Sequence, residues 1–264
     1  MRKLHTRSLL RAPHLVAGLL AAALAAQPAG DVRRVEGGII RGPVSAKRLA
    51  LVFTGHEYAE GATVILDALS RRGQHASFFL TGAFLRNPEH RAIVQRMVRD
   101  GHYVGPHSDA HLLYCPWTGP KTTLVSRQTF DNDIDRNLDA LTQFGIDRRQ
   151  VRYFLPPYEW YNEEIVRWAG ELGLTLVNFT PGTRSNADYT EESTPQFVAS
   201  ATIFDSIMGR EAGDPDGLNG FLLLLHLGAG AGRKDKFHPR VGELIDRLME
   251  KGYRFGRIDA LLER

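Results

Sequence analysis

The chain has 264 residues and carries 33 lysines and arginines against 30 aspartates and glutamates, for a formal charge of +3 at pH 7. Four of the basic residues and none of the acidic ones fall in the first 26 residues, so the remainder has a formal charge of −1. This balance excludes the strongly basic surface of a nucleic-acid-binding protein, and the length suits one large α/β domain. The single cysteine, Cys115, excludes an intramolecular disulfide and is predicted to pack in an aromatic segment.

The first 26 residues have the pattern of an export signal. Basic side chains open the chain, an apolar core begins at Leu15, and Ala23-Leu24-Ala25 resembles a small-residue cleavage site. The apolar run is too short for a comfortable membrane span. We therefore predict a signal peptide over residues 1–26 and a mature domain over residues 27–264, periplasmic or secreted and not stably inserted in a membrane. An uncleaved N-terminal anchor is the alternative.

Apolar runs and amphipathic runs alternate along the rest of the chain. Short apolar runs predict buried strands over residues 49–53, 77–80, 103–104, 151–155, 174–179 and 221–225. Apolar residues at helical spacing predict helices over residues 64–69, 88–98, 130–144, 165–169 and 241–248. This alternation is typical of an α/β fold with a parallel sheet or barrel. The connections over residues 112–129 and 181–195 are long enough to be functional.

Two histidines four residues apart, His107 and His111, follow the third predicted strand. If the segment turns helical after His107, both imidazoles lie on one face and Ser108 is free to cap the turn. That spacing suits two ligands of one metal ion, although local hydrogen bonding of the two rings is a simpler alternative. A further histidine, His226, ends the apolar run 221–225, and α/β folds place their chemistry at strand ends.

The run from His107 to His111 resembles the H-S-x-x-H motif of polysaccharide deacetylases, the NodB-homology carbohydrate esterases of family 4. The motifs of that family come in the order T-F-D-D-G, H-S/T-x-x-H, R-x-P-Y and L-x-H. This chain has counterparts in the same order, at residues 52–57, 107–111, 155–158 and 224–226. The resemblance runs from about residue 49 to 255 and implies a single-domain distorted (β/α) barrel with an incomplete ring.

The first motif is the most altered one. In the family its two adjacent carboxylates act as general base and as the metal ligand that joins the two histidines, but Thr54-Gly55 stands here when the chain is aligned on Phe53. Aligning on the following helix, with one inserted residue, instead puts His56 at the ligand position, followed by Glu57. We favour this second alignment because it leaves usable chemistry.

The resemblance then implies one divalent ion, expected to be zinc, held by His56, His107 and His111 with an open position for water. Glu57 would be the base that takes a proton from that water, although the roles of His56 and Glu57 can be exchanged.

The third motif also departs from the family pattern, because Leu155 stands where the arginine is expected. Arg184 can compensate for this loss, or it can be a solvated loop residue. The resemblance implies that the backbone N–H of Tyr158 helps to hold the developing oxyanion. Trp160 is predicted either to stack on a sugar ring or to pack at the start of a helix.

His226 matches the family's general acid, which protonates the leaving amine. It needs a carboxylate to orient it, with Asp188 and Asp109 as the two candidates. The resemblance implies an exported metal-dependent deacetylase acting on N-acetylated, or else O-acetylated, sugars of a polysaccharide or oligosaccharide. The alternatives are a catalytically inactive carbohydrate-binding pseudoenzyme of the same fold and a metal amidase acting on a non-sugar substrate.

Overall fold

The structure is a computed structural model that describes residues 31–263. The predicted signal peptide and the predicted start of the mature domain lie outside these residues. Within residues 31–263, no helix combines the length and apolar character needed to cross a membrane.

The centre of the fold is a parallel sheet in the order β5-β4-β3-β8, with β9 pairing the start of β3. Its strands are β3 (Arg48–Gly55), β4 (Ser77–Leu80), β5 (Tyr103–Pro106), β8 (Leu222–His226) and β9 (Arg254–Phe255). The register places Thr54 opposite His226 and Leu80 opposite Pro106, so these strands end at the same edge. The ligand-rich segments therefore meet at this edge, as the α/β prediction requires.

Two smaller sheets extend this arrangement into an incomplete ring. The first pairs β1 (Arg33–Val35) with β2 (Gly38–Arg41), and the second pairs β6 (Tyr153–Phe154) with β7 (Thr175–Leu176). Single bridges connect β2 to Val177 and to Phe221, and one hydrogen bond of 3.3 Å from Leu155 N to Pro106 O connects β5 to β6. The predicted distorted (β/α) barrel is confirmed.

The strands bury different side chains on their two faces. Ala50 and Val52 of β3 and Leu222 and Leu224 of β8 belong to one cluster in the interior of the ring. Because successive side chains of a strand alternate between faces, Thr54 and His226 continue the inward positions of β3 and β8. The outward positions of the strands pack against the helices in the larger core cluster.

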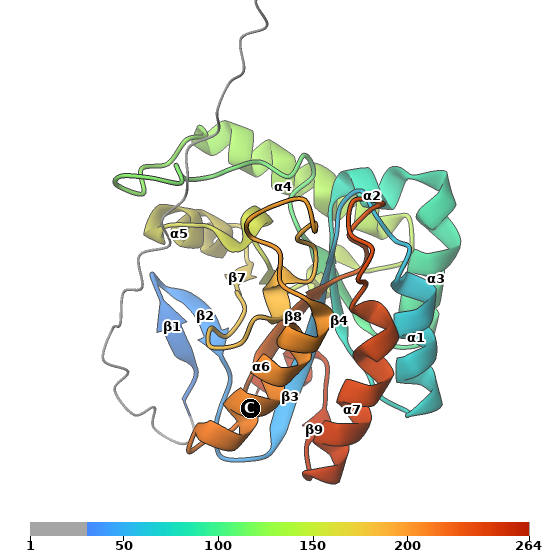
Figure 1. The fold of residues 1–264 in the computed structure, drawn as a ribbon. Helices are drawn as coiled ribbons and strands as arrows, with labels where there is room; N and C mark the ends of the chain where they lie inside the picture. The colour runs from blue at the N-terminus through green and yellow to red at the C-terminus, as the bar shows by residue number, and fades with distance from the viewer. Residues whose placement is uncertain (1–30, 264) are drawn as a thin grey trace, which may run out of the picture.

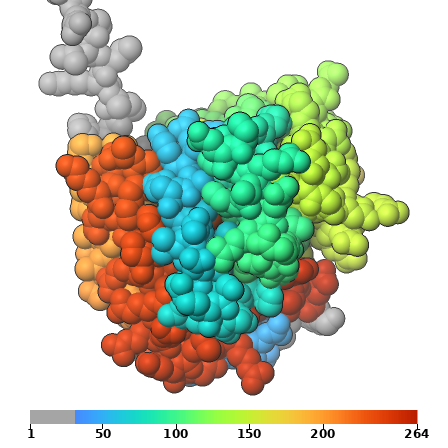
Figure 2. Space-filling view, turned by 90° about the vertical axis from the view of Figure 1, so that its right-hand side faces the viewer, coloured from blue at the N-terminus to red at the C-terminus, as the bar shows by residue number. Residues whose placement is uncertain are grey.

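The helices cover the outside of the sheet. They are α1 (Ala62–Arg71), α2 (Gly82–Arg86), α3 (Arg91–Arg99), α4 (Arg127–Thr142), α5 (Glu163–Glu171), α6 (Ser200–Gly213), α7 (Val241–Glu250) and α8 (Ile258–Leu262). Figure 1 shows α1, α3 and α7 on one side, opposite β1 and β2. Figure 2 views the side of α1 and α3 directly, with the orange-red C-terminal segments flanking them.

The five predicted helices are confirmed, each with slightly different ends. The predicted strands at 151–155 and 174–179 are longer than the observed β6 and β7. After β6, Pro156 and Pro157 cannot donate ladder hydrogen bonds. The sequence analysis missed β1, β2, β9, α2, α6 and α8, which are short or lack a clear apolar period.

Candidate active site

A cavity of about 1030 Å³ opens at the end of the sheet where β3, β5 and β8 stop. Its wall includes the seven residues that the sequence analysis expected to bind the ion, carry the reaction or bind the substrate: His56, Glu57, His107, His111, Tyr158, Trp160 and His226. They come from four separate segments, and the sheet register brings them together.

Three of these residues form a cluster of imidazole rings. The rings of His56 and His111 are stacked with centroids 4.4 Å apart and planes inclined by 12°. The ring of His107 meets that of His111 edge-on, with centroids 5.1 Å apart. The two histidines of the H-S-x-x-H motif thus lie close together, as their spacing predicts.

The backbone between His107 and His111 is not helical, so the predicted helical turn is wrong. Ser108 and His111 have left-handed φ angles of 70° and 54°. The buried carboxylate of Asp133 on α4 holds this turn, accepting hydrogen bonds from Ser108 Oγ at 2.6 Å, Asp109 N at 2.8 Å and Ala110 N at 2.9 Å. These bonds give the backbone N–H groups of Asp109 and Ala110 an acceptor within the non-helical turn.

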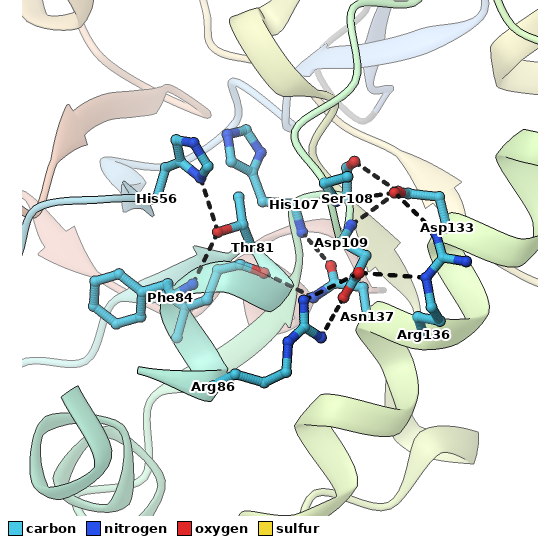
Figure 3. Close-up of polar contacts among 12 residues, drawn as sticks. His56, Thr81, Phe84, Arg86, His107, Ser108, Asp109, Asp133, Arg136 and Asn137 are labelled. Carbon is cyan, nitrogen blue, oxygen red and sulfur yellow. Dashed lines mark hydrogen bonds and ion pairs between the residues drawn. The ribbon is translucent and has the colours of Figure 1, made fainter. Parts of the chain in front are cut away.

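A second α4 side chain, Asn137, fixes the position of His107. Asn137 accepts a hydrogen bond from His107 N at 2.9 Å and donates one to Leu80 O at 3.1 Å, which joins the turn to β4. His107 Nδ1 donates to Leu155 O at 2.8 Å, so its Nε2 is left as the free acceptor nitrogen. Figure 3 shows Asn137 and Asp133 beside the turn, with the rings of His56 and His107 pointing the same way.

The three clustered histidines are neutral at neutral pH. Burial lowers the pKa of His107 well below its ordinary value, and nearby His111 lowers it further. Burial, with the charges of His56 and His226, lowers the pKa of His111 to about 3. Burial also lowers the pKa of His56, and Glu57 acts in the opposite direction. Neutral imidazoles have the free lone pair that a metal ligand needs.

The donor chemistry of this cluster therefore fits a zinc-type ion, since three neutral imidazoles are a known ligand set. In residues 31–263, however, no three His, Cys, Asp or Glu side chains are placed as ligands of one ion. The stacked rings of His56 and His111 explain this, because two parallel stacked rings cannot both hold one ion in their planes. One of the two rings has to rotate before all three histidines share an ion.

His226 forms a close pair with Asp188. Asp188 Oδ1 accepts a hydrogen bond from His226 Nδ1 at 2.6 Å, and Asp188 Oδ2 accepts one from His226 N at 2.9 Å. Burial acts to lower the pKa of His226, but the charge and hydrogen bond of Asp188, with the charge of Glu159, raise it. Asp109 instead pairs with Arg86 at 2.6 Å and Arg136 at 3.4 Å. Asp188 is therefore the carboxylate that orients His226.

Matches to known proteins agree with this geometry. A family model described as polysaccharide deacetylase matches residues 41–177. The chain belongs to the polysaccharide deacetylase family. A peptidoglycan-N-acetylglucosamine deacetylase of Bacillus cereus is 25% identical over 223 residues, which cover 84% of this chain and 70% of that protein. The chain spans 48%, 70% and 26% of the lengths of three curated relatives that it matches.

Solved structures of other deacetylase-family members share the fold. Bacillus subtilis PdaA, a family 4 carbohydrate esterase, superposes with a TM-score of 0.67 at 20% identity, over 86% of this chain and 85% of that one. A family 4 pseudoenzyme from Bacillus anthracis superposes with a TM-score of 0.64 at 20% identity, over 87% and 70%.

This deacetylase-family chain lacks the usual groups at two motif positions. Thr54, the next-to-last residue of β3, lines the cavity and is buried, and its hydroxyl has no hydrogen-bond partner among residues 31–263. Leu155 packs in the interior of the ring. Arg184 is exposed and lies outside the cavity wall, so the solvated alternative holds and it does not compensate for the missing arginine.

The rim of the deacetylase-type cavity is rich in aromatic side chains. Trp160 lies with its ring centroid 6.1 Å from that of Trp117, and its Nε1 donates to Pro116 O at 3.1 Å. Lys121 Nζ sits 3.8 Å from the centroid of the Trp160 ring. Trp117 and Tyr158 remain 45% and 43% exposed at the cavity, so apolar faces are available to a ligand.

The sequence analysis gave no role to Asp133, Asn137 and Glu159. Asp133 and Asn137 could have been noticed in the sequence, because they are polar residues four apart within the apolar stripe of α4. In the structure both are fully buried. Buried polar side chains need partners, so this pattern could have indicated a supporting role. Glu159 directly follows the third motif and lies in the cavity wall beside His226.

Proposed function

We propose that this chain is an exported, metal-dependent hydrolase that removes acetyl groups from N-acetylated sugars of a polysaccharide or oligosaccharide, with O-acetylated sugars as the second choice. The observation that carries the proposal is the cavity itself, which combines three neutral imidazoles with the His226–Asp188 pair. The Bacillus cereus relative, a peptidoglycan-N-acetylglucosamine deacetylase, supports the substrate class.

The residues that would hold the divalent ion, expected to be zinc, are His56, His107 and His111. Such an ion would polarise the acetyl carbonyl and make a nearby water more acidic. The exchanged arrangement, with Glu57 as a ligand and His56 as the base, stays open.

The chain's own groups would carry the proton and position the sugar. With its raised pKa and its Nδ1 bonded to Asp188, His226 can keep a proton on Nε2 and deliver it to the leaving amine. The backbone N–H of Tyr158 would help to hold the oxyanion, and Trp160 would offer its ring to a sugar face. Glu57, exposed at the cavity rim, is the base expected from the sequence.

A test of this function measures acetate release and new free amines from N-acetylglucosamine oligomers and peptidoglycan fragments, with simple aryl acetates as the comparison. Turnover of the oligomers, lost on chelation and restored by zinc, is expected. Preferential turnover of non-sugar amides would instead favour the metal amidase.

One observation favours a second candidate, a carbohydrate-binding pseudoenzyme of the same fold. The strand end that bears two carboxylates in the family bears Thr54 and Gly55 here. The test uses protein whose metal content has been measured. If calorimetry shows that it binds acetylated oligomers and no acetate is released, the result supports this candidate over the enzyme.

A further inference from the structure

Glu159 lies in an unusual backbone turn at the cavity. Tyr158 and Glu159 are consecutive non-glycine residues with left-handed φ angles of 59° and 54°, a conformation that a Cβ atom makes unfavourable. The turn is held by bonds from Glu159 N to Pro156 O at 3.1 Å and from Asn178 Nδ2 to Glu159 O at 2.8 Å. Residues that several surrounding hydrogen bonds hold in a strained conformation tend to cluster at functional sites.

The side chain of Glu159 contributes to the cavity wall and carries an unengaged carboxylate. Among residues 31–263, no side-chain or backbone donor forms a hydrogen bond or ion pair with it at contact distance; its neighbours act only through their charge. Those neighbours are His226 on β8 and Asp188, with Tyr189 also facing the group. Asp188, by contrast, has both oxygens bonded to His226 and is not free to take a proton.

The other carboxylate near the first motif is placed less favourably. Glu57 is exposed at the rim, and its charge and hydrogen bond act on the neighbouring hydroxyl of Tyr58, whose pKa is raised. Burial raises the pKa of Glu159 to about 7, with His226 opposing and Asp188 adding to that effect, and a raised pKa makes this carboxylate a better proton acceptor.

We propose that Glu159 is a further catalytic residue, the carboxylate that takes the proton from the attacking water in place of the carboxylates missing after β3. This assignment rests on the proposed function. One water O–H bond breaks and its proton goes to Glu159, while the water oxygen bonds to the acetyl carbon and the carbonyl π pair moves onto the carbonyl oxygen. The oxyanion then re-forms the C=O bond and the C–N bond breaks as His226 Nε2 gives its proton to the nitrogen, releasing acetic acid and the free amine.

The neighbouring positions of Glu159 and His226 also allow the two groups to return to their starting protonation states. After one turnover Glu159 holds a proton and His226 has lost one, so the transfer of a single proton between them restores both groups. No oxidant, reductant or other co-reactant is required.

The test compares Glu159→Gln with Glu57→Gln and with the control Glu163→Gln, an exposed residue outside the cavity wall. We expect Glu159→Gln to lower kcat on N-acetylglucosamine oligomers by about 10²–10⁴ with unchanged melting temperature, and the control to match the wild type. The wild-type rate should rise with pH through about 7 as Glu159 ionises, and fall as His226 loses its proton. An infrared carboxylic-acid band that disappears between pH 6 and 8 should be absent from Glu159→Gln.

The assignment is overturned if Glu159→Gln turns over near the wild-type rate while Glu57→Gln does not. If Glu159→Gln fails to fold, the test uses Glu159→Gly, because glycine adopts the left-handed φ without strain. Added formate supplies a carboxylate in place of the missing side chain and should restore turnover. A lack of restoration rejects the role of Glu159. A wild type that binds zinc but turns over no acetylated glycan or amide rejects the proposed function itself, and this role with it.

Discussion

Asp133 on α4 tests how the H-S-x-x-H turn is held in its non-helical shape. Its fully buried carboxylate accepts hydrogen bonds of 2.6, 2.8 and 2.9 Å from the turn. Replacing Asp133 with Ala leaves one hydroxyl and two backbone N–H groups without their acceptor. Bonds to a charged group contribute about 1.5–3 kcal/mol each and are not additive, so we expect a loss of about 3–5 kcal/mol in the free energy of unfolding.

For a domain of this size, that loss corresponds to a fall of roughly 6–20 °C in Tm. The measurement is denaturant unfolding followed by circular dichroism, together with a thermal scan. The matched control is Asp139→Ala on the same helix, whose carboxylate is 72% exposed and, within residues 31–263, pairs only with Arg148 at 3.3 Å. The control should change the free energy of unfolding by at most about 1 kcal/mol.

The reasoning is refuted if Asp133→Ala and Asp139→Ala have equal stability, because the turn would then not depend on the buried carboxylate. Zinc affinity gives an independent readout. Loss of a group that supports a metal ligand costs about 10–100-fold in affinity, so Asp133→Asn should bind zinc more weakly than the control even if it folds normally.

The histidines give three more predictions. His107→Ala and His111→Ala should each hold well below one equivalent of zinc by elemental analysis; unchanged stoichiometry in both rejects a shared ion. His226→Ala should lower kcat by about 10²–10⁴ with metal content intact, and Asp188→Asn should move the alkaline limb of the pH profile to lower pH, since it removes the charge that raises the pKa of His226. Burial lowers the pKa of His102 to about 4, so the unfolded chain binds its proton more tightly. The free energy of unfolding should therefore fall as pH drops from about 6.5 towards 4, and thermal scans of His102→Gln should show a shallower fall; equal slopes would assign the effect to other groups.

Much of the fold could be predicted from local pattern. The runs at residues 49–53, 77–80 and 221–225 form strands because continuous apolar residues with turn signals at their ends suit a sheet buried on both faces. The helix around residues 130–144 follows from its apolar period. The clustering of His107 and His226 was predictable too, because parallel strands end at one edge of the sheet.

Several features of the site depend on residues distant in the sequence. Asp109 and Asp188 were equal candidates as the partner of His226, and the long segment after β7 decides between them by carrying Asp188 to β8. Local spacing likewise favoured a helical turn after His107, but the segment forms a non-helical turn whose donors are bonded to Asp133, 25 residues from Ser108.

The sequence by itself therefore determined the alternation of strands and helices and the identity of the clustered histidines, because those depend on periodicity and on position at strand ends. Only the tertiary structure decided the left-handed turns at Ser108 and Glu159, the pairing of Asp188 and the place of the half-buried Glu159 in the cavity wall. The physical reason is that a strained φ angle or a shifted pKa depends on the groups that surround it, and here those groups come from other segments of the chain.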